Sequence, residues 1–249
     1  PAFLMAAGIK PPKRVFAHGW WTNEGRKISK SVGNVIEPVS LVETFGLDPV
    51  RYFLLREVPF GNDGDFSRRA MINRMNGELA NDYGNLAQRV LSMIAKNCGG
   101  RVPQPQADRT PEDKALIEAG EGLLVRVRAA MDVQAFHDAI EAIWVVIRAA
   151  NAYVDHQAPW KLKTENPARM DTVLYVLAET VRKLALLTQP FMPESSGRIL
   201  DQLAVPADAR TMAALLPGQE LKPGTLLPEP RGVFPRHVEV AEEGAGSPG

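Results

Sequence analysis

The chain has 249 residues, of which 45% are hydrophobic and 23% are charged, as in an ordinary soluble globular protein. Its 29 basic and 29 acidic side chains cancel, which excludes the broad positive field of a nonspecific nucleic-acid binder, so any RNA contact should be local. The single cysteine, Cys98, excludes an internal disulfide and favours a reducing, cytoplasmic location. No apolar run is long enough to predict a membrane span.

The N-terminal part is expected to mix short elements. It opens on an apolar helix end at Pro1–Ala7 without a polar lead-in, so we interpret the chain as a fragment of a longer protein. A strand is predicted near Val15–Trp21. Two short helices follow, the first beginning at Pro38 and ended by Gly46, and the second capped by Asp48.

Between the strand and these helices lies the segment Asn23–Asn34, which is rich in small residues. Lys27 and Lys30 lie three positions apart in it, and a mobile loop is expected. A lysine ammonium on a flexible stem suits a polyphosphate whose charge changes during a reaction. The alternative interpretation is an ordinary solvated connection.

From Ser67 onward the hydrophobic pattern is helical, with apolar residues recurring at steps of three and four. Four long helices and a short one are predicted to begin near Ser67, Thr110, Phe136, Met170 and Pro193. Such amphipathic helices cannot bury their apolar faces alone, so we expect an α-helical bundle. The last residues, 241–249, are predicted to be disordered.

Two sites on these helices carry side chains suited to an unpaired base. Asn85 and Arg89 are neighbours beside the apolar face of the first long helix. An amide and a guanidinium fork can read a base edge, although an ordinary polar flank is the alternative. Trp160 follows the third long helix, where it could stack on a base or lie in the core or its rim. No metal site is predicted, because His137 and His156 have no partners at metal-ligand spacing.

The lysine segment resembles the Lys-Met-Ser-Lys-Ser signature of class I aminoacyl-tRNA synthetases, with Ile28 in the methionine position. Together with Phe45–Leu55, it is similar to the methionyl-tRNA synthetase family. The resemblance implies a mainly α chain. Residues 1–65 would end a Rossmann-like catalytic domain with its stem-contact segment, and residues 66–216 would form an α-helical anticodon-binding domain. Residues 217–249 would be a tail that folds back towards the catalytic side.

The resemblance extends to the two base-binding candidates. The segment Asn81–Arg89 is similar to the family's Asn-Leu-x-x-Arg, and Gln157–Trp160 resembles its Gln-Ala-Pro-Trp. The match implies that Asn85 and Arg89 read the anticodon and that Trp160 stacks on its first base.

For the reaction, the resemblance implies ATP-dependent attachment of methionine to its tRNA through methionyl-adenylate, with Mg²⁺. Lys27 and Lys30 would be catalytic, and Ser29 and Ser31 would join them in binding ATP. A monomer is expected. The partners are the methionine tRNA, with ATP and methionine held mostly by a missing N-terminal part.

The sequence also departs from the family pattern. It contains no His-x-Gly-His, which holds the ATP phosphates in this class, and no Cys-x-x-Cys pair. The chain alone is therefore expected to be inactive. The alternatives are another class I synthetase of the valyl, leucyl or cysteinyl type, a stand-alone tRNA-binding module, and a helical scaffold whose lysine loop is incidental.

Overall fold

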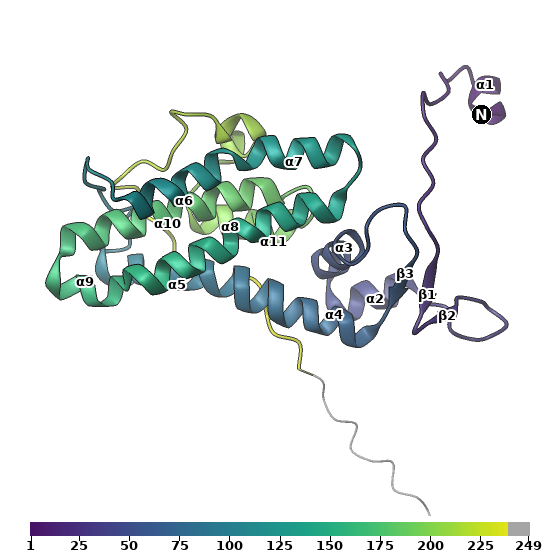
Figure 1. The fold of residues 1–249 in the computed structure, drawn as a ribbon, viewed down its shortest axis with the longest axis horizontal. Helices are drawn as coiled ribbons and strands as arrows, with labels where there is room; N and C mark the ends of the chain where they lie inside the picture. The colour runs from purple at the N-terminus through teal and green to yellow at the C-terminus, as the bar shows by residue number, and fades with distance from the viewer. Residues whose placement is uncertain (239–249) are drawn as a thin grey trace, which may run out of the picture.

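The computed structural model describes residues 1–238. The expected mainly α class is confirmed: a helical bundle occupies most of the molecule, and one small three-stranded sheet lies towards the N-terminal end (Figure 1). The disorder predicted for residues 241–249 falls outside the described part. No helix within residues 1–238 combines the length and apolar character that a membrane crossing requires.

The small sheet has the strand order β2-β1-β3. Strand β1 (Trp21–Asn23) pairs antiparallel with β2 (Arg26–Lys27) and parallel with β3 (Gly64–Phe66). The β1–β2 turn consists of Glu24 and Gly25, whose φ angles are +49° and +74°. Two positive φ values give the turn that matches the twist of a two-residue hairpin.

The strand predicted over Val15–Trp21 is therefore wrong for all but its last residue. After α1 (Ala2–Ala6), the chain forms no strand up to Trp20, whose backbone bonds to Asp63 and Gly64 just before β1 begins. Val15 and Trp20 are 81% and 78% exposed, whereas the ring of Phe16 lies 5.3 Å from that of Phe60. In Figure 1 this stretch projects away from the rest of the molecule. The β-branched and aromatic residues indicated extended backbone but not a partner strand.

Helices α2 (Pro38–Phe45) and α3 (Leu47–Arg56) meet at Gly46, whose φ of +86° breaks the helix as predicted. The predicted cap is wrong, because Asp48 lies inside the first turn of α3. Its carboxylate instead accepts a hydrogen bond, at 2.6 Å, from the backbone N–H of Ser195 in the first turn of α11 (Pro193–Gln202). Asp48 thus joins the N-terminal part of the chain to the bundle.

The first long helix is continuous but not uniform. It begins with α4 (Arg68–Arg74), passes through a π-helical stretch, η1 (Met75–Gly84), and continues as α5 (Asn85–Asn97). Ser67, near which this helix is predicted to begin, caps it by accepting a hydrogen bond from the N–H of Ala70. A π-helix shifts the angular positions of the residues beyond it. Regular α geometry resumes at Asn85, so Asn85 and Arg89 keep their predicted i,i+4 relation.

The rest of the bundle comprises α6 (Pro111–Glu121), α7 (Leu123–Asp132), α8 (Phe136–Gln157), α9 (Pro159–Glu165), α10 (Pro167–Thr188) and α11. Helix α6 begins after Thr110, as predicted, and Thr110 and Asp113 form a capping box there. The second predicted helix is interrupted at Gly122, and the short helix α9 was not predicted. Helix α10 is buried along most of its length and packs on α5, α6, α8, α9 and α11.

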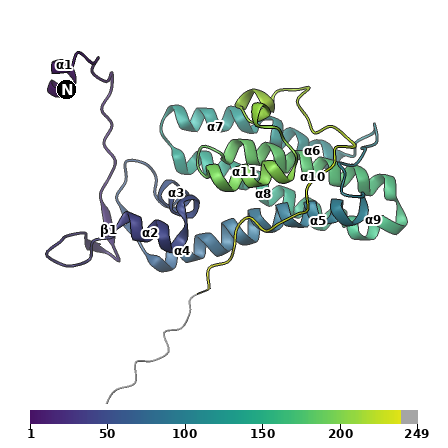
Figure 2. The ribbon, with the colours of Figure 1, turned by 180° about the vertical axis from the view of Figure 1, so that it is seen from behind.

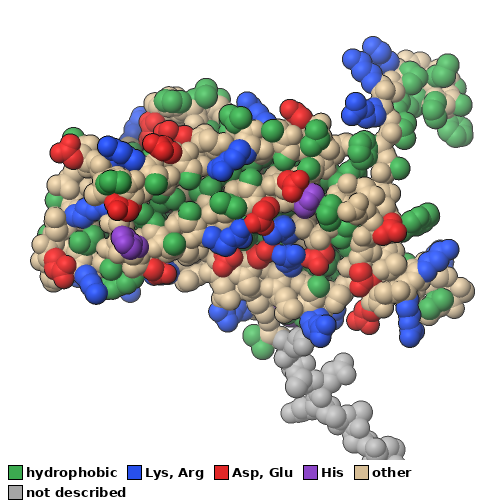
Figure 3. Space-filling view, in the orientation of Figure 1, with side chains coloured by type: hydrophobic (Ala, Val, Ile, Leu, Met, Phe, Trp, Pro, Cys, Tyr) green, Lys and Arg blue, Asp and Glu red, His purple; other side chains and the backbone are tan. Residues whose placement is uncertain are grey.

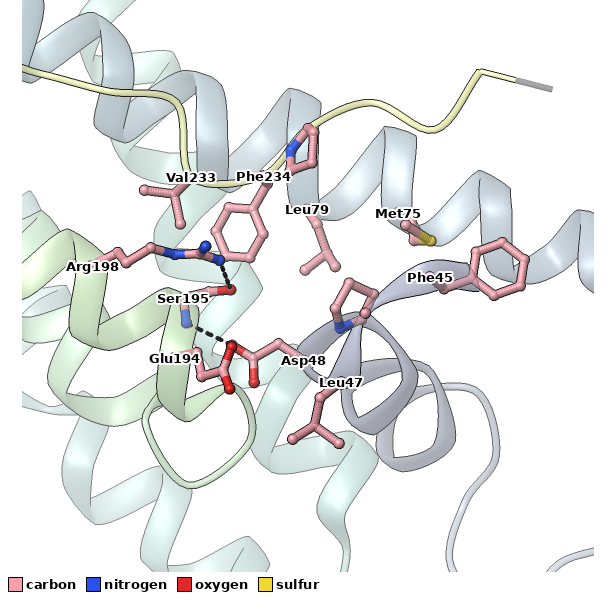
Figure 4. Close-up of a pocket in the computed structure, with 13 residues that line it drawn as sticks. Phe45, Leu47, Asp48, Met75, Leu79, Glu194, Ser195, Arg198, Val233 and Phe234 are labelled. Carbon is pink, nitrogen blue, oxygen red and sulfur yellow. Dashed lines mark hydrogen bonds between the residues drawn. The ribbon is translucent and has the colours of Figure 1, made fainter. Parts of the chain in front are cut away.

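After two short 3₁₀ turns, η2 (Ala207–Ala209) and η3 (Met212–Leu215), the chain returns along η1 (Figure 2). The Phe234 ring lies 5.5 Å from that of Tyr83, and His237 exchanges two backbone hydrogen bonds with the Asn76 side chain. This segment helps to line a cavity of about 240 Å³ between α2, α3, η1 and α11 (Figure 4).

Acidic and basic side chains are interspersed over the face shown in Figure 3, in keeping with the zero net charge.

Candidate functional site

The lysine loop leaves the small sheet at the end of β2, where Lys27 is the last strand residue. Asn34 closes the loop at its neck. Its side-chain oxygen accepts a hydrogen bond from the Ser29 N–H at 2.9 Å, and its amide donates to the Lys27 carbonyl at 3.1 Å. Asn23 of β1 in turn donates to the Asn34 carbonyl at 2.9 Å. The base of the loop is thereby fixed to the sheet, while its tip, Lys30–Gly33, forms turns.

The charged groups of this loop are free to meet a ligand. Lys27 and Lys30 are exposed, and neither ammonium has an ion-pair or hydrogen-bond partner among residues 1–238. The hydroxyls of Ser29 and Ser31 lie 2.7 Å apart. The loop therefore presents two cations and two hydroxyls near one another, a set of donors suited to phosphate oxygens.

A carboxylate anchors the hairpin from which the loop extends. Asp65 of β3 accepts hydrogen bonds from the Thr22 hydroxyl at 2.5 Å and from the Gly25 N–H at 2.7 Å. Both bonds favour the ionised carboxylate and hold the pKa of Asp65 below its usual value, and the bond from Thr22 contributes more than the bond from Gly25. The turn therefore rests on an ionised group across neutral pH.

At the other end of the molecule, the chain turns sharply between α8 and α9. Ala158 adopts a left-handed conformation, with φ of 44° and ψ of 58°, and Pro159 is the first residue of α9. Pro159 is buried, whereas the next residue, Trp160, is 49% exposed. The turn thus presents the indole ring at the surface instead of in the core.

Arg89 and Trp160 are brought together from two different helices. The guanidinium carbon of Arg89 lies 5.8 Å from the centroid of the Trp160 ring, within cation–π range. The Nη2 atom of Arg89 also donates to the carboxylate of Asp155, on the last turn of α8, at 2.6 Å. Asn85 is exposed one turn earlier on α5. One surface therefore carries an amide, a guanidinium and a flat aromatic ring.

Buried charges support this turn from beneath. The guanidinium of Arg169 donates to both oxygens of Asp113 and also to the side-chain oxygen of Gln157, the last residue of α8, at 2.6 Å. The Tyr153 hydroxyl donates to Asp113 at 2.5 Å. Burial raises the pKa of Asp113, but the hydrogen bonds from Arg169 and Tyr153 outweigh it and leave the pKa below its usual value. An ionised carboxylate thus fixes the end of α8 and, through it, Trp160.

Reasoning from the sequence missed Asn34, Asp155 and Arg169 as parts of these sites. Asn34 and Asp155 lie within or beside the motifs that carry the resemblance, and their short polar side chains were a usable signal. Arg169 is remote in sequence from the residues that it supports. Nothing short of the packing of α10 against α6 and α8 indicates its role.

The single cysteine of the chain and a metal site have no place in these two sites. Cys98 lies at the C-terminal end of α5. Burial is the main cause that raises the pKa of its thiol to about 12, and the nearby Asp171 carboxylate adds to it. A thiol with that pKa is not a nucleophile at neutral pH. Within the described chain, no group of three or more His, Cys, Asp or Glu residues is placed to hold a metal ion.

The two candidate sites lie far apart. In Figure 1 the hairpin of β1 and β2 is at one end of the molecule and α9 is at the other, with the bundle between them. A ligand that contacts both sites must therefore be as long as the bundle.

Comparison with known proteins places this geometry in a family. Residues 1–91 match the family described as tRNA synthetases class I (M), and residues 102–243 match the anticodon binding domain of methionyl tRNA ligase. A methionine–tRNA ligase from Brucella suis is 56% identical over 243 residues, which are 98% of this chain and 47% of that protein. One from Mycobacterium leprae is 54% identical and covers 98% of this chain and 46% of its own length.

A solved structure gives the same result. Mycobacterium tuberculosis methionyl-tRNA synthetase in complex with methionyl-adenylate matches with a TM-score of 0.88 and 55% identity, covering 95% of this chain and 47% of that one. Its apo form matches with a TM-score of 0.86 and 51% identity, covering 96% and 47%. The chain thus spans about half the length of the relatives that it matches.

Proposed function

The chain belongs to the methionyl-tRNA synthetase family, and from that premise we propose that its protein attaches methionine to the methionine tRNA in an ATP-dependent reaction. In the first step the methionine carboxylate attacks the ATP α-phosphate and pyrophosphate leaves. In the second the terminal ribose of the tRNA takes the aminoacyl group and AMP leaves. The names of the relatives, and the methionyl-adenylate bound to the Mycobacterium tuberculosis enzyme, support this reaction.

Within this reaction, Lys27 and Lys30 stabilise the negative charge that builds on the departing pyrophosphate. Two features of the loop support this role. Both ammonium groups are exposed and unpaired within the described residues, and Asn34 fixes the loop's base while leaving its tip, with Lys30, exposed. Ser29 and Ser31 complete the proposed ATP-binding group.

Mg²⁺ accompanies ATP in this proposal by family resemblance alone. Residues 1–238 offer no cluster of acidic, histidine or cysteine side chains that could hold the ion. We therefore assign it to no residue of this chain. The positive charge that this chain supplies to the phosphates is that of the two lysine ammoniums.

The surface at the α8–α9 turn reads the anticodon. The half-exposed ring of Trp160 supplies a face on which an unstacked base can stack. Arg89 and Asn85 supply donors and an acceptor for base edges. In the free protein, the Asp155 carboxylate accepts a hydrogen bond from one nitrogen of the Arg89 guanidinium and so holds the guanidinium beside the Trp160 ring.

Three further assignments belong to the same proposal. Residues 1–65 form the end of the catalytic domain with its stem-contact segment, residues 66–216 form the anticodon-binding domain, and residues 217–249 form the returning tail. The protein works as a monomer, and it works in the cytoplasm. The single half-buried cysteine is compatible with a reducing compartment.

The observation that carries the proposal is the meeting of Arg89 and Trp160 across two helices, 5.8 Å apart. The direct test is binding of this chain to a methionine tRNA transcript and to the same transcript with another anticodon, at one stated salt concentration. Preference for the methionine anticodon is expected. Equal affinity for both transcripts would contradict the proposal, and preference for another anticodon would favour a different class I synthetase.

A stand-alone tRNA-binding module is the second candidate, favoured by the match of residues 102–243 to an anticodon binding domain. Methionine-dependent exchange of pyrophosphate into ATP separates the two functions. We expect no exchange by this chain alone, and exchange once it is joined to the N-terminal half of a relative. A joined protein that binds tRNA but still shows no exchange would favour the module.

A further inference from the structure

A cavity of about 270 Å³ lies between α6 and α10, apart from both candidate sites. Its walls also include Arg109, from the linker before α6, and Glu220, from the segment after η3. Helix α6 contributes Gly120 at the inner wall, and helix α10 contributes Lys183. The cavity thus joins segments that are distant in sequence, and none of its residues has a role in the proposed reaction.

Lys183 is the most unusual residue of this cavity. The residue as a whole is only 8% exposed, and its ammonium has no ion-pair or hydrogen-bond partner among residues 1–238. The Nζ atom is not fully buried, because Lys183 lines the open space of the cavity. Its stem lies against Gly120, where an added Cβ would come within 3.4 Å of the lysine Cδ. The glycine therefore provides the room in which a long cationic side chain fits between two helices.

A second unpaired cation lines the same cavity. The Nη1 atom of Arg109 is buried and has no hydrogen-bond partner, and within residues 1–238 its guanidinium forms no ion pair. The other buried cations of the bundle differ. Arg182 is bonded to Glu179 at 2.8 Å, and Arg169 is bonded to Asp113 at 2.7 Å.

The nearby carboxylates form no direct ion pair with these two cations within the described residues. Glu179 already accepts three hydrogen bonds, two from Arg182 and one from the Leu221 N–H at 3.1 Å. Glu121 and Glu220 line the cavity as exposed residues, and Glu220 accepts a bond from the Gly218 N–H at 3.0 Å. Neither comes within ion-pair distance of Lys183 or Arg109, although the charge of Lys183 helps to lower the pKa of Glu220. The two cations of the cavity therefore have no direct ion-pair partner among residues 1–238.

A poorly exposed cation without a direct partner is costly, and proteins pair such groups or use them to bind a ligand of opposite charge. We infer that this cavity binds a small oxyanion group, a carboxylate or a phosphate, between Lys183 and Arg109. Both side chains can then donate charge-assisted hydrogen bonds to one anion. The exposed carboxylates of Glu121 and Glu220 disfavour ligands that carry further negative charge.

The test follows Lys183 itself, because the lysine loop can also attract phosphate. The chain is labelled with ¹³C at the lysine ε carbon, and the Lys183 signal is assigned by its loss in Lys183→Met. Sodium phosphate and sodium acetate are titrated separately against sodium chloride at matched ionic strength. A saturable shift of the Lys183 signal is expected with at least one of the two anions.

Three variants are used to measure the site. Loss of one hydrogen bond to a charged group weakens binding by roughly tenfold or more, so Arg109→Gln should reduce the affinity reported by Lys183 to that extent. The matched control, Lys114→Met, removes an exposed lysine of the same helix α6 and should leave the affinity unchanged. Lys183→Met replaces a buried charge by an apolar chain of similar length and should still fold, as circular dichroism will show.

A shift with phosphate alone assigns a phosphate ligand, a shift with acetate alone assigns a carboxylate, and a shift with both supports the shared oxyanion chemistry. The inference is overturned if neither anion moves the Lys183 signal beyond the effect of chloride. It is also overturned if Arg109→Gln leaves the affinity for the anion unchanged.

Discussion

The guanidinium of Arg169 and the carboxylate of Asp113 form a two-point ion pair beneath the α8–α9 turn, with Nη2 2.7 Å from Oδ1. Asp113 is fully buried, so its charge depends on this partner. Removal of one member of a buried pair leaves an uncompensated charge, at a cost of about 3–5 kcal/mol. We expect Arg169→Met to lower the free energy of unfolding in urea by that amount. Arg198→Met, at an exposed arginine, is the control, and an equal loss in both variants would contradict the assignment.

The same carboxylate predicts a pH dependence. The pKa of Asp113 is lower in the folded chain than the ordinary value of about 3.9, so its ionisation favours the folded state. That contribution is complete above the ordinary pKa and is lost as pH falls through the folded pKa. The free energy of unfolding should therefore fall below about pH 4, and Asp113→Asn should flatten this part of the curve. A mutant curve parallel to that of the wild type would refute the linkage.

Cys98 should react slowly with thiol reagents. Burial and the Asp171 carboxylate raise its pKa to about 12, so the thiol stays protonated near neutral pH. In the unfolded chain, a cysteine with a pKa of about 8.5 is already partly ionised at that pH. We expect alkylation by iodoacetamide at pH 8 to be at least ~100-fold slower in the native chain than in urea, and to accelerate towards pH 11. Comparable rates in both states would show that the thiol is accessible and ionised.

Asp48 should stabilise the bundle through α11 and not through its own helix. Its carboxylate accepts the Ser195 N–H, one of the donors that a helix N-terminus leaves unpaired. Asp48→Ala should lower the free energy of unfolding by about 1–2 kcal/mol, the usual cost of losing such a cap. Asp208→Ala, at an exposed acid, should change little. An unchanged midpoint in the Asp48 variant would show that the carboxylate does not stabilise α11.

Lys30 should act on the transition state. In the complete synthetase, Lys30→Ala should slow methionyl-adenylate formation by ~10²–10³-fold, the scale for losing one preorganised donor. Methionine binding should hardly change, because the charge that Lys30 meets develops only during the reaction. Single-turnover kinetics measures both, with Lys13→Ala at another exposed lysine as control. A normal adenylation rate would exclude the catalytic role.

Much of the fold could be predicted from local chemistry. The turn at Gly46 and the helix starts near Ser67 and Thr110 depend on side chains adjacent in sequence, and they occur where predicted. The resemblance located Arg89 and Trp160, and the structure brings them into contact. Their function remains a prediction.

What could not be predicted depends on tertiary contacts. The π-helical stretch ends at Gly84, against which the returning tail packs Phe234 so closely that an added Cβ would lie 3.3 Å from it. Asp48 caps a helix almost 150 positions away, as its bond to Ser195 shows. The left-handed Ala158 has no sequence signal, since alanine disfavours positive φ. Its neighbour Gln157 is instead held by Arg169.

Anticodon reading by Asn85, Arg89 and Trp160 is the central claim, and one binding measurement tests it most directly. The dissociation constants of the complete synthetase for a methionine tRNA and for the same tRNA with a changed anticodon are compared in Trp160→Ala and Arg89→Ala. Trp160→Ala should weaken cognate binding by about 1–3 kcal/mol through lost stacking, with methionine activation intact. Arg89→Ala should in addition bring the two constants closer together, because base-edge contacts specify sequence whereas backbone contacts only position. If both variants keep the wild-type affinity and the wild-type ratio, the surface at the α8–α9 turn does not read the anticodon.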